Sequence, residues 1–549
     1  MTAADGRAAD RDDRESRRNL VAILAGAAVV TAAIGVRGDF PLSDDWSYAY
    51  SSQVLCTEGV LRFLPWTGAS LVFQTWYGAL LCRLVGFSFE ILRASTLVLA
   101  TLGAVGFDRL LATAGVRGPI RALALACFAL GPLYVNLAFT FMTDVPFTVA
   151  AVWAGYAYAH GFAKSSRRSL VFGGIASAVA LLIRQHGVFV AAAAALTALS
   201  HRDRSWRDRL ADAAAAAAFP AVVAIGYHVW LLEWHGAPEA VATKLGEAAS
   251  PTFTGVVNAA FRGVATLGFL LAPVALAVRR DVVARLPRLT LALSALLGLL
   301  ACALWLRLDA AMFYLTNVMY DLGLGASSLR DTQFLGLRPP VALGTPLRAV
   351  LTPVAVLAAA VLAAACFGSA RLRRDQVAHF LTIAVAVLFL GSLLHTRYYF
   401  DRYLLVIVPF ALAATCVSAT ARVGRSSVVV AVLLAVYAVA GTHDYLAWNR
   451  ARYAGLAELT NAGVSPREID GGMEFNAWHL AASLGTWPSD AEARVGQPFT
   501  RKSWWWVVDD RYVASFRPLP GHAVLRAVPY RRWLPPGEGR VFILERASP

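Results

Sequence analysis

Long apolar segments, separated by short polar or basic ones, recur along most of this chain. A helix that crosses a bilayer needs about 20 consecutive, mostly apolar residues. About thirteen segments approach that length, near residues 20–36, 90–112, 119–138, 145–162, 169–183, 186–200, 211–232, 259–278, 288–306, 347–367, 377–395, 403–421 and 426–442. Only 15% of the residues are charged, against about 25% in a typical soluble protein. The chain is therefore predicted to be an α-helical polytopic membrane protein with about thirteen transmembrane helices.

Composition divides the 549 residues into three parts. Residues 1–19 are polar with mixed charges, which predicts a disordered cytoplasmic tail. Residues 20–442 form the predicted transmembrane domain. Residues 443–549 are less hydrophobic and mix glycine, proline and charge with short apolar stretches, which predicts a small α/β domain outside the cytoplasm. In the first outer loop, residues 61–86 are rich in Trp, Phe and Leu, so interfacial helices are expected there.

Arginine clusters set the predicted orientation. If the segments cross in alternation, every dense cluster falls on the side of the N-terminus; the clusters are at residues 7–18, 109–121, 164–168, 202–209, 279–288, 371–374 and 422–425. Because cytoplasmic loops are enriched in Lys and Arg, the N-terminus is predicted to be cytoplasmic. The Arg- and Ala-rich composition points to a GC-rich bacterial genome, and hence to a bacterial cytoplasmic (inner) membrane.

The net charge of +15 is spread between apolar segments and is not gathered on one soluble surface. Membrane lipids are therefore predicted partners and nucleic acid is not. Four of the six cysteines lie within apolar segments, where a thiol acts as a small hydrophobic group. Cys56 and Cys82 fall on the outer side; whether they pair is left open, since pairing cannot be read from sequence.

An acidic stretch directly follows the first apolar segment. Residues 38–50 read GDFPLSDDWSYAY and place Asp39, Asp44 and Asp45 within seven residues at the predicted outer edge of the membrane. Carboxylates at such a position indicate water, a cation or a function. The alternative is a solvated loop in which Ser43 or Asp44 caps an interfacial helix.

Three other polar features fall on the same predicted face. Asp144 lies at the outer end of a segment, where the alternative role is a helix cap followed by Pro146. Arg184 lies where segments 169–183 and 186–200 adjoin as a hairpin or one broken helix, and the alternative is a snorkelling arginine. Residues 395–409 read HTRYYFDRYLLVIVP, which alternatively anchors the interface with arginine and aromatic residues.

Together these residues suit transfer of a group from a lipid phosphate. A carboxylate can take the proton from an acceptor hydroxyl. Arginines can hold a phosphodiester and its leaving phosphate, bidentately if well placed. A lipid tail on the donor would explain why the chemistry takes place at the edge of the bilayer.

The chain resembles the GT-C superfamily of membrane glycosyltransferases, in the branch of protein O-mannosyltransferases and lipid A aminoarabinose transferase. The matching stretches are Asp44-Asp45-Trp46-Ser47-Tyr48-Ala49, Met142-Thr143-Asp144-Val145-Pro146, Arg184, and Arg402-Tyr403-Leu404-Leu405 running to Pro409. Residues 444–449 and 469–476 also resemble the end of bacterial members of this group. The resemblance implies a GT-C catalytic domain over residues 20–442.

The resemblance further implies a polyprenyl-phosphate-sugar donor and inversion at the sugar carbon by a single displacement onto an extracytoplasmic hydroxyl or amine. Asp44 would be the general base. The family often has Asp-Glu where this chain has Asp44-Asp45, so the alternative is that Asp45 shares or takes the role. Asp144 would orient the acceptor or a metal. The full set of implied site residues is Asp44, Asp45 and Asp144 as catalytic; Arg184, Arg397 and Arg402 on the donor phosphate; and Trp46, Tyr48, His186, Tyr398 and Tyr403 as substrate contacts.

No metal ligands are predicted, because the histidines are isolated and no cluster has transition-metal spacing. Relatives differ in metal use, so no cofactor is assigned and a divalent cation is left open. The sugar and the acceptor, whether glycan, lipid or protein, are also open. The alternatives are a ligase of lipid-linked glycans with the same fold, a transporter or flippase, and a non-catalytic scaffold. A transporter would favour midplane charges and repeated halves, which the sequence does not show.

Overall fold

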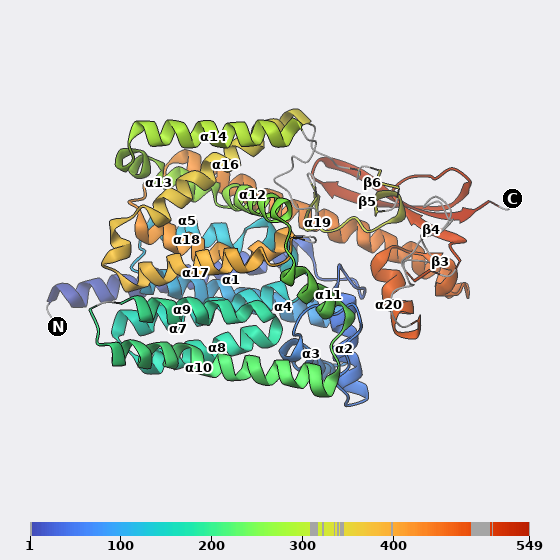
Figure 1. Cartoon of the computed structure of the whole chain (residues 1–549). Coiled ribbons are helices and arrows are strands. Elements are labelled where there is room, and N and C mark those ends of the chain that lie inside the picture. Colours follow the sequence, from blue (N-terminus) through green and yellow to red (C-terminus); the bar gives the residue numbers. More distant parts are fainter. Residues whose placement is uncertain are drawn as a thin grey trace.

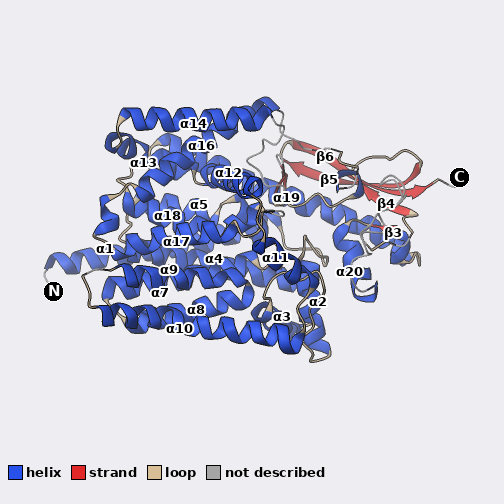
Figure 2. Ribbon diagram, viewed as in Figure 1, coloured by secondary structure: helices blue, strands red, loops and turns tan. Residues whose placement is uncertain are grey.

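A computed structural model of the chain describes residues 3–547, apart from residues 202, 308–316, 321–322, 334, 338–339, 341–344, 397–398, 485–505 and 508. A bundle of helices makes up most of it, and a small sheet lies at one end (Figures 1 and 2). The bundle helices are α1 (Ala3–Ile34), α4 (Phe89–Thr113), α5 (Pro119–Ala129), α6 (Pro132–Ala138), α7 (Asp144–Lys164), α8 (Arg167–Ile183), α9 (Val188–Ser200), α10 (Trp206–Val229), α12 (Phe253–Leu270), α13 (Ala272–Arg285), α14 (Arg288–Arg307), α16 (Thr345–Phe367), α17 (Gln376–Ser392), α18 (Ile407–Ser418) and α19 (Arg425–Asn461).

Every predicted apolar segment coincides with one or two of these helices. Within the described chain, six helices are long and apolar enough to cross a membrane, or seven if the bent pair α5–α6 is one span. Shorter apolar helices, including α9, α17 and α18, pack among them. The prediction of a helical polytopic membrane protein is confirmed.

Prolines mark the places where two predicted segments divide into separate helices. Pro132 opens α6 after a bend of 48° from α5, and Pro273 lies in the first turn of α13, directly after α12. Proline lacks the N–H that would continue the preceding helix but fits a first turn. The helix α1 is longer than the apolar segment predicted for it. It begins at Ala3, within the predicted disordered tail, where Ala, Arg and Glu favour helix.

The arginine-rich connections meet at the end of the bundle that carries the N-terminus (Figure 1). Arg285 and Arg371 donate hydrogen bonds to the carbonyls of Ser418 and Val417, which brings three connections together. Arg167 forms ion pairs with aspartates of α10 across the neighbouring connection. The clusters assigned to one side from sequence therefore do share one end of the molecule.

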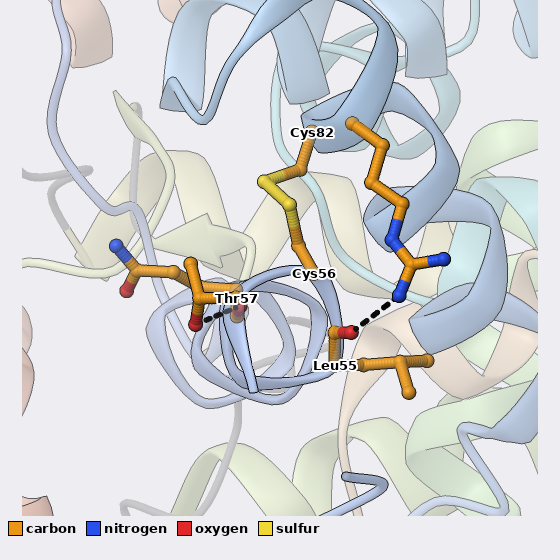
Figure 3. Close-up of a disulfide and its surroundings, with 6 residues drawn as sticks. Leu55, Cys56, Thr57 and Cys82 are labelled. Carbon is orange, nitrogen blue, oxygen red and sulfur yellow. Dashed lines mark hydrogen bonds between the residues drawn. A yellow bond between two sulfur atoms is a disulfide. The ribbon is translucent and has the colours of Figure 1, made fainter. Parts of the chain in front are cut away.

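The opposite end carries the first loop, built from two short helices, α2 (Asp45–Thr57) and α3 (Val72–Val85), joined by a Cys56–Cys82 disulfide (Figure 3). The Arg83 guanidinium donates to the Leu55 carbonyl beside it, at 3.3 Å. Four large apolar side chains at helical spacing on α3 are exposed: Phe73, Trp76, Leu80 and Leu84. Such a stripe is typical of a helix that lies on a membrane surface, as predicted.

The C-terminal unit begins where α19 continues beyond the bundle. It holds a four-stranded sheet of order β3-β4-β6-β5, formed by β3 (Ile469–Asp470), β4 (Tyr512–Ser515), β5 (His522–Trp533) and β6 (Pro536–Arg546), with β3 and β4 parallel and the other pairs antiparallel. The end of α19 packs on β5 and β6. Gly455 permits this close approach, because a Cβ there would lie 2.6 Å from Ile543 Cγ1. A small α/β unit at this end agrees with the predicted fold class.

The remaining elements are short and lie between the bundle helices or beside the sheet. They are α11 (Glu239–Ala249), α15 (Arg330–Gln333), α20 (Met473–Leu484), β1 (Met319–Tyr320), β2 (Gly323–Leu324), the π-helix η2 (Trp230–His235) and the 3-10 turns η1 (Gln185–Gly187), η3 (Ala370–Arg373), η4 (Asp401–Leu404) and η5 (Pro466–Glu468). The turn η1 connects α8 to α9, and both helices pack along α10. The two predicted segments are thus a hairpin, with Arg184 at its tip.

The disulfide gives a first testable prediction. The two cysteines are 26 residues apart, and a cross-link of that length stabilises a fold by about 3 kcal/mol in the chain-entropy treatment. Replacing both with serine should lower the melting temperature (Tm) of the purified protein in detergent. A reductant should lower the Tm of the wild type toward that of the variant and leave the variant unchanged. A wild-type Tm that does not respond to reductant would contradict the pairing.

Candidate functional site

Asp44 lies at the start of α2, but its carboxylate makes no hydrogen bond to the helix. Oδ2 accepts a hydrogen bond from Arg402 Nη2 at 2.8 Å, and Oδ1 accepts one from the Trp66 indole at 3.1 Å. The alternative in which the Asp44 side chain caps the helix is therefore not what the structure shows. The Asp44 carboxylate instead faces a guanidinium that comes from 358 residues further along the chain.

The neighbouring Asp45 has a different environment. Its carboxylate accepts hydrogen bonds from the backbone N–H groups of Leu42, at 2.7 Å, and Phe141, at 3.0 Å. The side chain is buried, and burial raises the pKa of Asp45 from its ordinary 3.8 to about 7. Asp45 thus joins the first outer loop to the segment before α7, while Asp44 is the member of the pair that contacts an arginine.

Arg402 lies in η4 and is held there by its neighbour. The Asp401 carboxylate accepts hydrogen bonds from the N–H groups of Val318, Met319 and Arg402 itself, at 2.6 to 3.1 Å. Burial raises the pKa of Asp401 to about 7. Asp401 therefore attaches the β1 segment to the turn that presents Arg402.

The Arg402 guanidinium is only 6% exposed. Burial opposes its charge, but Asp44 and Asp144 outweigh burial and hold the pKa of Arg402 well above its usual value. Its Nε and Nη1 atoms have no hydrogen-bond partner among the described residues. Buried N–H groups are nearly always paired in native proteins. Two unpaired donors on one buried guanidinium therefore indicate a position where a further acceptor, such as an anionic group, can bind.

Asp144 and Arg184 form a second ion pair. Asp144 is the first residue of α7, and its Oδ1 lies 2.9 Å from Nη1 of Arg184, which follows the last residue of α8. A further bond of 2.7 Å runs from Arg184 Nε to the Thr143 hydroxyl. Both charged side chains are largely buried. Arg184 is therefore engaged with a carboxylate inside the protein, unlike a snorkelling arginine.

The Tyr403 ring connects the two pairs. The Cζ atoms of Arg184 and Arg402 lie 5.6 and 5.9 Å from its centroid, which is the range of cation–π contacts. Tyr48 is buried nearby; burial raises its pKa, and the charge of Asp44 raises it further. The two carboxylate–arginine pairs and the two tyrosines therefore form one cluster, which we call the acid–arginine site.

The other predicted residues are placed as follows. Trp46 is 1% exposed and packs against Trp66 and Trp506, with ring centroids 6.0 and 5.4 Å away. The His186 ring lies 5.4 Å from that of His395, at the edge of the site near Tyr403. Arg397 and Tyr398 lie outside the described residues.

Sequence reasoning did not assign Trp66, Thr143 or Asp401, which contact the site directly. Asp401 was within a stretch already singled out, and its position beside Arg402 was an available signal. Thr143 is likewise adjacent to Asp144. Nothing in the sequence connects Trp66 to Asp44, because the contact depends on how the loop between α2 and α3 folds.

In the part of the chain that the structure describes, no three His, Cys, Asp or Glu side chains lie close enough together to hold a metal ion. The carboxylates of the acid–arginine site each contact a guanidinium instead.

Comparison with known proteins gives one match to a family model. The model of dolichyl-phosphate-mannose-protein mannosyltransferases matches residues 72–228, a range that includes Asp144, Arg184 and His186. No curated protein sequence matches significantly. The predicted resemblance to membrane glycosyltransferases of the protein O-mannosyltransferase branch is confirmed by the family model.

The solved structures that are similar to the chain include the following three. ArnT from Cupriavidus metallidurans in the apo state is 16% identical, with 96% of this chain and 98% of that chain covered and a TM-score of 0.35. The Saccharomyces cerevisiae protein O-mannosyltransferase Pmt1-Pmt2 complex bound to the sugar donor is 18% identical, with 41% of this chain and 34% of that chain covered and a TM-score of 0.34. The Archaeoglobus fulgidus oligosaccharyltransferase in the apo form is 11% identical, with 77% and 55% covered and a TM-score of 0.40.

The raised pKa of Asp45 predicts how it affects stability. Its pKa is higher in the folded protein, so between about pH 4 and 7 the folded state binds more protons than the unfolded state. The contribution of Asp45 to stability is therefore lost as the pH rises through that window. In thermal unfolding from pH 4 to 7, the Tm of an Asp45→Asn variant should rise relative to the wild type as the pH increases. A Tm difference that does not change with pH would contradict this assignment.

Proposed function

We propose that this chain, which is related to the GT-C membrane glycosyltransferases, transfers a monosaccharide from a polyprenyl phosphate to a hydroxyl or amine outside the cytoplasm. The observation that carries the proposal is the Asp44–Arg402 pair. It combines a carboxylate that can accept a proton with a buried guanidinium whose remaining N–H groups are unpaired among the described residues. Transfer from a phosphate is helped by a base for the acceptor proton and by a cation for the leaving phosphate, and this pair offers both.

Asp44 is the proposed general base. Its carboxylate takes the proton of the acceptor O–H or N–H as the acceptor atom attacks the anomeric carbon. The bond from the acceptor to that carbon forms while the bond from the carbon to the phosphate oxygen breaks, so the configuration inverts. The Trp66 indole donates a hydrogen bond to one oxygen of the Asp44 carboxylate and Arg402 donates one to the other. These two bonds fix the orientation of the carboxylate that receives the proton.

Arg402 and Arg184 are the proposed phosphate-binding residues. The polyprenyl phosphate leaves with the electrons of the broken bond, and guanidinium groups stabilise the negative charge that develops on it. Asp144 positions Arg184 through their ion pair, with Thr143 as a second support. The Tyr403 ring lies at a contact distance from both guanidinium groups. Tyr403, Tyr48 and His186 are the proposed contacts of the sugar.

The setting of the site supports a lipid-borne donor. The acid–arginine site is at the end of the bundle opposite the arginine-rich connections, next to α3 with its exposed apolar stripe. Under the positive-inside rule this end is extracytoplasmic, and the N-terminus lies in the cytoplasm. A disulfide at the same end suits an oxidising compartment such as the bacterial periplasm. The proposed location is thus a bacterial cytoplasmic membrane.

The test is mass spectrometry of envelope glycolipids, glycans and glycoproteins from an intact strain and a strain with this gene deleted. The proposal expects at least one molecule that loses the mass of one sugar on deletion and regains it on complementation. Loss of a whole oligosaccharide would instead indicate a ligase of lipid-linked glycans. An envelope with no sugar lost from any class would contradict a glycosyltransferase function.

Asp44→Asn should reduce transfer about 10²- to 10⁴-fold, the usual effect of removing a general base. The change keeps the size of the side chain but leaves no group to accept the proton. Initial rates in membranes of the complemented deletion strain give the effect, with Asp39→Asn as the matched control. Asp39 lies in the same loop and accepts a hydrogen bond from the Phe89 amide. Wild-type rates for Asp44→Asn would eliminate it as the base.

Arg402→Gln should weaken binding of undecaprenyl phosphate to the purified protein by about 10- to 100-fold, since charge-assisted hydrogen bonds contribute about 1.5–3 kcal/mol. The control is Arg83→Gln at the same end of the molecule, which removes the bond to the Leu55 carbonyl. Titration of undecaprenyl phosphate by tryptophan fluorescence measures both variants. Equal affinity for Arg402→Gln and the wild type would show that Arg402 does not bind the phosphate.

A further inference from the structure

A carboxylate from the C-terminal unit reaches the loop that carries Asp44. Glu474, in the first turn of α20, accepts a hydrogen bond from the backbone N–H of Ser43 through Oε1, at 3.2 Å. Its Oε2 accepts from the Ser328 hydroxyl and from Arg452 Nη1, the latter at 3.0 Å. Glu474 is 1% exposed. It therefore joins the amide directly before Asp44 to α19 and to the segment before α15.

Ser43 has a backbone conformation that needs such support. Its φ is +56°, in the left-handed region, which costs a residue other than glycine roughly 1–2 kcal/mol. The conformation turns the chain between Leu42 and the start of α2. Asp45 closes the other side of the turn by accepting the Leu42 N–H. The direction in which Asp44 leaves the turn thus depends on groups that hold the turn from both sides.

The same part of α19 holds the loop further upstream. The Phe40 ring stacks on Tyr453 with centroids 4.6 Å apart and planes 5° from parallel. Arg450 donates hydrogen bonds to the carbonyls of Arg37 and Gly35. The stretch from Gly35 to Ser43 therefore contacts the C-terminal unit at Gly35, Arg37, Phe40 and Ser43. Between these points Arg93 of α4 donates hydrogen bonds to the carbonyls of Val36, Gly38 and Phe40, so α4 holds the upstream part as well.

A contribution to the stability of the fold is a weak explanation for why Glu474 and Arg452 are present as a buried ion pair. The Arg452 side chain is fully buried between the rings of Tyr453 and Trp448, at 4.6 and 5.2 Å. Replacing a buried ion pair with apolar residues of similar volume is often neutral or stabilising. Hydrogen bonds from a fixed carboxylate do, however, define the position of the amide they bind.

We propose that Glu474 is a positioning residue for the transfer reaction. Through Glu474 and Arg452, the C-terminal unit fixes the turn at Ser43 and so aims the Asp44 carboxylate at Arg402 and the acceptor. This inference rests on the proposed function. It assigns the C-terminal unit a part in the site itself, beyond capping the bundle.

The experiment removes the pair as a unit. A Glu474→Leu/Arg452→Met double variant leaves no buried charge unpaired, but it does leave the Ser43 amide and the Ser328 hydroxyl without this acceptor, so its Tm should fall modestly and the protein should stay folded. Its maximal transfer rate should fall about 10- to 100-fold, because a misplacement of about 1 Å can cost about 10²-fold. Undecaprenyl phosphate should bind it with unchanged affinity. A C-terminal unit that merely unfolded would lower the Tm much further and affect binding as well.

The matched control is Arg330→Met/Asp510→Leu, which removes another buried ion pair of the C-terminal unit, between α15 and the segment just before β4. Asp510 also pairs with Arg546, which keeps Asp509 as a partner in this control. The control should transfer sugar at the wild-type rate. Glu474→Gln is a single-site test. It keeps the side-chain shape and an oxygen for the Ser43 amide, so it should lose less activity than the Glu474→Leu/Arg452→Met variant.

Two results would overturn the inference. One is a folded Glu474→Leu/Arg452→Met variant that transfers at the wild-type rate. The other is an equal loss of rate in the Arg330→Met/Asp510→Leu control. A wild-type protein that transfers no sugar in the same membranes would instead refute the proposed function, so the two failures are distinguishable.

Discussion

A charged side chain withdrawn from water is stable only when other groups replace the lost hydration. The carboxylates at the outer end of this protein meet that requirement in two ways. Asp44 and Asp144 face guanidinium groups, which a phosphate can share. Asp45 and Asp401 face backbone N–H groups, which do not move independently of the chain. The carboxylates that face guanidinium groups are suited to contact a substrate. The carboxylates that face backbone N–H groups fix the loops that carry the first pair.

This division explains how the site is assembled from distant parts of the chain. Its groups come from the first outer loop, the start of α7, the tip of the α8–α9 hairpin and η4. No single element carries a complete set. Buried backbone-bonded carboxylates hold these connections in register, and the C-terminal unit adds Glu474 from the other side. The helices of the bundle supply the rigid frame, and the ends of the helices supply the groups of the acid–arginine site.

The sequence allowed three features to be predicted: the helical class, the sharing of one end by the arginine clusters, and the convergence of acidic and arginine motifs on the opposite face. Each follows from composition or from the alternation of segments along the chain. Side-chain partners did not follow. Asp44 and Asp45 have the same chemistry and adjacent positions, and only the turn at Ser43 separates their directions. Trp66 and Glu474 reach Asp44 and Ser43 from 22 and 431 residues away, which no local pattern encodes.

The helix α19 runs without a break from the bundle into the C-terminal unit, so its length sets how far that unit lies from the bundle. Its 37 residues span about 55 Å at 1.5 Å per residue, against about 30 Å of bilayer hydrocarbon, so roughly 25 Å stands beyond the lipid. The sheet packed on the end of α19 is therefore held at a set height above the acid–arginine site and at a set rotation about the axis of α19. Lengthening α19 by one residue would rotate the sheet by about 100°. Only insertions close to whole helical turns would preserve the alignment of the two parts.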